Sequence, residues 1–155
     1  MKIWVAGFGN EHREDDAAGV ILAERIHKYL ASLPGVEVSL CLERQLLPEL
    51  AEELDVDLAI FCDADTVLHE GGFSLGAIAP NPCLNGFNIH SMGPEWLLAL
   101  AEQAATPPMS ALLLTVSGES FDFSQTPTTA CQRRIEKAEE AFRSYWENRR
   151  RIDRI

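Results

Sequence analysis

The sequence is poor in cysteine and lacks any paired cysteine motif. Its four cysteines, at positions 41, 62, 83 and 131, form no CxxC pair. This spacing gives no support to a thiolate zinc site or to a disulfide framework. Cys41 and Cys62 lie inside apolar runs, where a thiol behaves as a small hydrophobic side chain. We therefore expect reduced core cysteines and a cytoplasmic protein.

Long hydrophobic runs are also missing. No apolar stretch approaches the ~20 residues that a membrane-spanning helix needs. The apolar N-terminal run breaks at Gly7, too early for a secretory signal peptide. The sequence predicts no membrane partner.

Positive charge is scarce: 13 Lys and Arg stand against 24 Asp and Glu, so the net charge is −11 and the pI is about 4.7. A field of that sign repels the phosphates of nucleic acid, and we expect no nucleic-acid partner. The basic tail, 149–155, is interpreted as a helix C-terminus, where cations complement the helix dipole.

What the sequence does contain is a regular alternation of strand and helix patterns. With 155 residues and 46% hydrophobic composition, it predicts one globular domain, 1–155. Expected strands are 2–6, 36–42, 57–62, 73–78 and 111–116, and expected helices are 15–33, 48–54, 94–105 and a last one opened by Thr126 and Pro127. This order predicts an α/β fold: a three-layer αβα sandwich with a mostly parallel sheet of about five strands. Sites in such folds form at the carboxyl ends of the strands.

The turn after the first strand contains Gly7-Phe8-Gly9-Asn10 but not the third glycine of a dinucleotide-binding loop, because His12 stands there. It also carries four carboxylates, which would repel a diphosphate: Glu11, Glu14, Asp15 and Asp16. The same cluster opposes a flavodoxin-like small-ligand domain, which stays the more distant alternative. A purely structural interpretation has Asp15 capping the following helix and Asp16 complementing its dipole.

Two further polar residues follow predicted strands or open a predicted helix. Asp63 leaves the buried third strand, and His90 precedes the helix that begins near Pro94. Each alone also fits a turn or a solvated loop. Together with Asp16, they would meet at one sheet edge, and two oxygens with one nitrogen suit nickel, zinc or a similar divalent ion. Three protein ligands would leave coordination positions open for chemistry.

These residues belong to a longer pattern. Gly7-x-Gly9-Asn10 is followed by Asp15-Asp16-x-x-Gly19-Val20, by the segment 60–64 (IFCDA), by 90–93 (HSMG), and by 116–121 with Thr126-Pro127. In this order and spacing the sequence resembles the hydrogenase maturation proteases, over nearly its whole length.

The resemblance implies an endopeptidase that removes the C-terminal extension of a nickel-loaded [NiFe] hydrogenase large-subunit precursor, of the aspartic type by family classification. It assigns nickel recognition and catalysis to Asp16, Asp63 and His90, with nickel supplied by the precursor. The family often has Glu where Asp16 stands, and Asp15 is the neighbouring candidate for that position. The segment 117–120 (SGES) does not form a GxSxG elbow, and no Asp-Thr-Gly motif is present. A nickel-site chaperone that does not cut is the nearer alternative.

Overall fold

The computed structural model describes residues 1–82, 93–108, 110–124 and 126–153. In chain order its elements are β1 (Lys2–Phe8), the 3-10 turn η1 (Glu14–Ala17), α1 (Ala18–Ala31), β2 (Glu37–Glu43), η2 (Pro48–Leu54), β3 (Leu58–Asp65), η3 (Glu70–Gly72), β4 (Phe73–Ala77), α2 (Pro94–Gln103), β5 (Ser110–Ser117) and α3 (Thr129–Ile152). None of the described helices combines the length and apolar composition that a membrane crossing requires.

The five strands form one sheet in the order β2-β1-β3-β5-β4. Neighbouring strands are parallel from β2 to β5, and β4 alone is antiparallel, to β5. The reversal follows from the short connection after β3, because a parallel return needs a long crossover. Gly71 and Gly72 make that turn with positive φ values of 78° and 87°. The mostly parallel α/β sheet expected from the sequence is confirmed.

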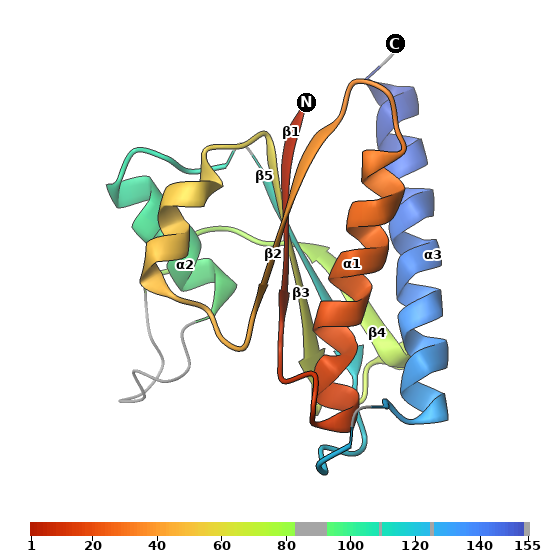
Figure 1. The fold of residues 1–155 in the computed structure, drawn as a ribbon. Helices are drawn as coiled ribbons and strands as arrows, with labels where there is room; N and C mark the ends of the chain where they lie inside the picture. Colours follow the sequence, from red (N-terminus) through yellow and green to blue (C-terminus); the bar gives the residue numbers. More distant parts are fainter. Residues whose placement is uncertain (83–92, 109, 125, 154–155) are drawn as a thin grey trace.

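Helices cover both faces of the sheet, giving three layers (Figure 1). On one face α1 and α3 pack side by side; on the other, α2 packs with η2. Side chains alternate between these layers along each strand. In β3, Ile60 and Cys62 point toward α1 and α3, whereas Ala59 and Phe61 point toward α2 and η2. Asp63 and Asp65 continue the second series, so both lie on the α2 face.

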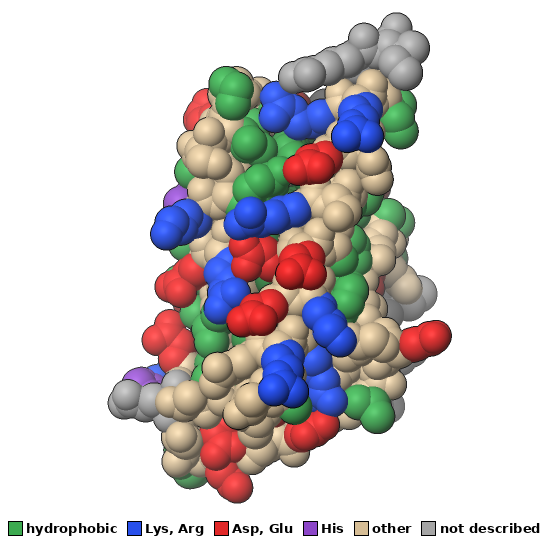
Figure 2. All heavy atoms as spheres, turned by 90° about the vertical axis from the view of Figure 1, so that its right-hand side faces the viewer, with side chains coloured by type: hydrophobic (Ala, Val, Ile, Leu, Met, Phe, Trp, Pro, Cys, Tyr) green, Lys and Arg blue, Asp and Glu red, His purple; other side chains and the backbone are tan. Residues whose placement is uncertain are grey.

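The outer surface of α1 and α3 carries interspersed charges of both signs (Figure 2). Glu139 of α3 pairs with Arg25 of α1 at 3.3 Å and with Arg143 at 2.6 Å. The Arg143 guanidinium lies 4.6 Å from the centre of the Tyr29 ring, on α1. Most of the Lys and Arg residues are in these two helices, so the acidic excess is concentrated on the rest of the molecule.

Two helix starts differ from expectation. The predicted helix from residue 15 begins with the separate 3-10 turn η1, and α1 proper starts at Ala18. The last helix is capped by Thr128 rather than Thr126, because the Thr128 hydroxyl accepts from the Cys131 N–H at 3.2 Å. Its buried face includes Trp146, stacked on Phe142 with ring centres 6.2 Å apart.

The start of α1 lies unusually close to the ends of β1 and β3. A Cβ atom on Gly19 would come within 2.6 Å of the carbonyl oxygens of Phe8 and Cys62. On Gly9, whose φ is +138°, it would come within 1.9 Å of the Asp16 carbonyl oxygen. These two glycines allow the turn after β1 and the first turn of α1 to pack onto the strand ends.

Gly19→Ala tests this packing. Alanine favours a helix over glycine by about 1 kcal/mol, yet the overlap with two carbonyls should lower the free energy of unfolding by about 2 kcal/mol or more. The matched control is Gly76→Ala, where nothing lies within 4 Å of the added Cβ; it should change stability by less than about 0.5 kcal/mol. Urea unfolding of both variants measures the difference, and equal stabilities would contradict the close approach.

Candidate functional site

The candidate site is at the carboxyl edge of the sheet, beside the ends of β1 and β3. The chain leaves β1 to form β2 on one side, whereas β3 lies on the other side of β1. The strand order therefore reverses between β1 and β3, and open α/β sheets bind ligands at such a reversal. The turn after β1, the turn after β3 and the 118–128 connection meet at this edge, the lower end in Figure 1.

Asp16 is held in η1 by the turn that precedes it. Its Oδ2 accepts from the Asn10 N–H at 2.8 Å, and its own N–H donates to the Arg13 carbonyl at 2.9 Å. The side chain is partly exposed. With four other residues it lines a pocket of about 330 Å³: Arg13, Ala64, Thr66 and Phe121. An oriented, accessible carboxylate at this position can bind a cation or a polar substrate group.

Asp63 lies in the last part of β3, mostly shielded from water. Burial raises the pKa of Asp63 to about 7, although the Ala64 N–H, which donates to Oδ1 at 2.8 Å, lowers it. The negative charges of Asp16 and Asp65 raise it further. Asp16 is thus near enough to Asp63 for its charge to affect the Asp63 pKa. A shielded carboxylate beside other acids favours a proton or a metal cation as its counterion.

The third predicted residue, His90, lies outside the described residues. Within the described part of the chain, no three His, Cys, Asp or Glu side chains are grouped closely enough to hold a metal ion. Asp16 and Asp63 therefore make an incomplete pair there, and the trio stays a prediction.

Asp15 does not cap α1, contrary to the structural interpretation of the sequence. It is fully buried and its carboxylate faces the start of α3. It accepts hydrogen bonds from the N–H groups of Thr128 at 2.7 Å, Glu119 at 2.8 Å and Ser120 at 3.2 Å, and from the Thr128 hydroxyl at 3.0 Å. Tertiary contact has replaced the local cap, because these donors approach only when the 118–128 connection folds over η1. Asp15 is thus not an accessible ligand.

The environment of Asp15 keeps it ionised. Burial by itself would raise its pKa, but the hydrogen bonds from Glu119, Thr128 and Ser120 outweigh burial, and the pKa of Asp15 lies below its ordinary value. Two backbone hydrogen bonds also join this connection to the turn after β1. The Glu14 N–H donates to the Ser124 carbonyl at 2.9 Å, and the Ser124 N–H donates to the His12 carbonyl at 3.0 Å. Asp15 therefore fixes the loop that presents Asp16.

Sequence analysis missed a second polar group on the α2 face of the sheet. His69 Nε2 lies 2.9 Å from Asp65 Oδ2 and 3.3 Å from the Thr115 hydroxyl, which in turn hydrogen-bonds with Ser74. The available signal was the period of two along β3, which puts Asp65 on the same face as Asp63. Nothing local indicated that His69 would turn back toward it.

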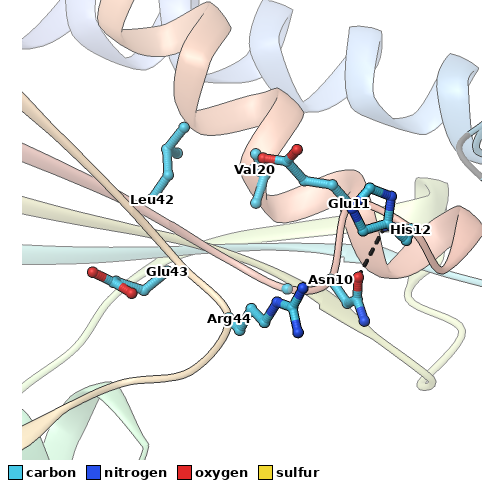
Figure 3. Close-up of a pocket in the computed structure, with 8 residues that line it drawn as sticks. Asn10, Glu11, His12, Val20, Leu42, Glu43 and Arg44 are labelled. Carbon is cyan, nitrogen blue, oxygen red and sulfur yellow. Dashed lines mark hydrogen bonds between the residues drawn. The ribbon is translucent and has the colours of Figure 1, made fainter.

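A separate pocket of about 270 Å³ lies on the other side of β1, between the ends of β1 and β2 (Figure 3). In this view Asn10 and Arg44 lie at the end of the strands, and Val20 and Leu42 line the apolar side. Asn10 connects this pocket to Asp16 through its N–H. The turn after β1 thus separates two hollows at the same edge.

No protein-family model and no curated protein matches the sequence. Solved structures do match. The chain is similar to the hydrogenase maturating endopeptidase HybD from E. coli, with 23% identity, a TM-score of 0.69, and coverage of 96% of this chain and 93% of that one. It is similar to the [NiFe] hydrogenase maturation protease HycI from Thermococcus kodakarensis KOD1, with 24% identity, a TM-score of 0.67, and coverage of 91% and 89%.

An endopeptidase from Escherichia coli, solved in solution, has 26% identity and a TM-score of 0.66, with coverage of 92% of this chain and 90% of that one. The resemblance seen in the sequence is therefore confirmed as a shared fold over nearly the whole of both chains.

Asp15→Asn tests the buried carboxylate. The asparagine amide has one acceptor oxygen and places its NH₂ group against N–H donors. The free energy of unfolding should therefore fall by about 3 kcal/mol or more. The exposed Asp122 of the same connection provides the control, since Asp122→Asn should be within about 0.5 kcal/mol of wild type. Chemical denaturation at pH 7 makes the comparison, and a loss no larger than that of a local cap (about 0.5–2 kcal/mol) would contradict it.

The pKa of Asp63 predicts a pH-dependent effect of Asp63→Asn. The folded protein keeps a proton on Asp63 up to about pH 7, whereas the unfolded chain releases it near 3.8. The folded state binds more protons between these values, so this group makes wild type less stable as pH rises through that window. Asp63→Asn should therefore gain stability relative to wild type from pH 4 to pH 7 and keep the advantage at pH 8. Urea titrations across this range measure the difference in the free energy of unfolding between the variant and wild type. A difference that does not change with pH would contradict the raised pKa of Asp63.

Proposed function

We propose that this protein is an endopeptidase that matures a [NiFe] hydrogenase by removing the C-terminal extension of the nickel-loaded large-subunit precursor. The observation that carries the proposal is the fold shared with named hydrogenase maturation endopeptidases across nearly the whole of both chains. The pairing of Asp16 with Asp63 at the strand-order reversal supports it, because a substrate metal would find two carboxylates there.

In this proposal nickel belongs to the substrate. Asp16 and Asp63 contribute carboxylate oxygens and His90 an imidazole nitrogen, which recognise the metal and set the scissile bond beside it. Burial and, to a lesser extent, the charges of Asp16 and Asp65 raise the pKa of Asp63, and a cation at this position would offset that repulsion. The precursor brings its own metal, so the free protein is expected to hold nickel weakly.

The finer assignments are part of the same proposal. The first is the aspartic-type peptidase class, in which water rather than a side chain attacks the carbonyl. The others are the cytoplasmic location and the large-subunit precursor as partner. The described site supports the class by offering carboxylates, and Asp15 is unavailable as a ligand because four hydrogen bonds surround its buried oxygens.

The test is cleavage of a nickel-loaded precursor, followed by mass spectrometry as loss of its C-terminal extension. Wild type should cut the loaded precursor and leave the nickel-free one intact. Asp63→Asn, Asp16→Ala and His90→Ala should each reduce cleavage at least about 100-fold, since each removes a group that contacts the metal. Asp16→Glu should retain activity because it keeps the carboxylate.

Asp122→Asn is the matched control, an exposed acid on the same edge that should cut normally. A wild-type protein that binds the loaded precursor without cutting it would identify the chaperone alternative instead. Normal cleavage by all three variants that remove a metal-contacting group would refute the site.

A further inference from the structure

The pair formed by His69 and Asp65 has the geometry of a proton-transfer group. Nε2 of His69 lies 2.9 Å from Asp65 Oδ2, and both side chains are about one quarter exposed, at 24% and 28%. A carboxylate beside one nitrogen of an imidazole fixes which nitrogen carries the proton and which way the ring faces. The pair is partly shielded and yet remains within reach of solvent.

The backbone on both sides of His69 is also fixed. Its N–H donates to the hydroxyl of the buried Ser117 at 2.9 Å, and its carbonyl accepts from the Gly72 N–H at 2.9 Å. The His69 backbone is therefore held by β5 and η3, and the ring is oriented by Asp65 at the end of β3. A surface histidine that only balanced charge would need none of these constraints.

The hydrogen bonds define the role that each nitrogen can take. An ionised Asp65 only accepts, so Nε2 carries the proton, and it cannot also take a proton from Thr115 at 3.3 Å. This excludes a Thr-His-Asp nucleophile triad, in which acid and hydroxyl contact different nitrogens. Nδ1 is then the basic nitrogen, and no described residue hydrogen-bonds to it.

His69 is next to the proposed nickel-recognition residue without contacting it. Asp63 pairs in register with Thr115 in the neighbouring strand, and alternation puts both side chains on the α2 face. The Thr115 hydroxyl is the atom 3.3 Å from His69 Nε2. One side chain thus separates Asp63 from His69.

We propose that His69, oriented by Asp65, is the catalytic base and acid of the cleavage; this inference depends on the proposed cleavage, and it assigns to an imidazole the proton transfer that a carboxylate performs in the aspartic-type class. As the oxygen of water bonds to the scissile carbonyl carbon, one of its protons moves to Nδ1. When the C–N bond breaks, Nδ1 returns that proton to the departing amine nitrogen. The products are a new carboxyl terminus and a free amine, and no other reactant is consumed.

Other groups at this edge fit the role less well. Asp16 and Asp63 are assigned to the substrate metal, and a carboxylate bound to a cation is a poor base. His12 is on the same edge, but it is exposed and no described carboxylate hydrogen-bonds to its ring. Activation of a base requires such an orienting partner, and in the described chain His69 has one.

The experiment compares His69→Gln with His12→Gln on a nickel-loaded precursor. Glutamine can still donate to Asp65 from near the position of Nε2, but it cannot transfer a proton at Nδ1. His69→Gln should lower kcat by about 10²- to 10⁴-fold with an unchanged KM, unchanged binding of the loaded precursor and an unchanged melting temperature. His12→Gln should cut at the wild-type rate.

Chemical rescue separates proton transfer from a structural role. His69→Ala leaves a partly exposed space, so added imidazole should restore cleavage in this variant and should not accelerate wild type. Wild-type kcat in His69→Gln, or loss of activity without rescue in His69→Ala, overturns the inference while the proposed function stands. A wild-type protein that does not cut the loaded precursor removes both.

Discussion

The buried carboxylate of Asp15 is the interaction on which the functional edge depends. Its two oxygens accept four hydrogen bonds from the 118–128 connection, two of them from Thr128, the N-cap of α3. A buried anion is unfavourable unless it is this fully bonded, so the connection must close over η1 for the fold to be stable. Closure in turn fixes Asp16, the neighbouring residue, against the Asn10 N–H. Stability and presentation of the site are thus coupled through adjacent residues.

The acids at this edge differ in the stability of their charges because their environments differ. Asp15 is surrounded by donors, which stabilise its charge. Asp63 is shielded with one N–H donor and two acidic neighbours, which destabilise its charge. Asp16 is partly exposed, so its environment is intermediate between those of Asp15 and Asp63. An acid with few hydrogen-bond donors is tolerated where the surrounding structure is held by acids that are fully hydrogen-bonded.

Much of this arrangement is predictable from the sequence, since apolar periodicity and turn residues determine the strands, the helices and the layers. The edge position of Asp16 and Asp63 follows from the rule that parallel strands end together. Two features depend on long-range contact instead. Asp15 bonds to residues more than 100 positions away, so a local pattern assigns it to the wrong helix. His69 is only four residues from Asp65, but its backbone is held in place by the Ser117 hydroxyl, 48 positions away.

The two layers that cover the sheet are unequal. Among the described residues, the cluster under α1 and α3 spans the sheet from Ile3 to Val116, whereas the cluster under α2 and η2 is smaller and includes Trp4, Phe61 and Leu97. Segments with less buried apolar area open at a lower free energy than the whole domain. Slow amide exchange is thus expected to be concentrated in α1, α3 and the inner strands. The face that bears Asp63, Asp65 and His69 is therefore the one expected to open first, while the opposite layer keeps the fold intact.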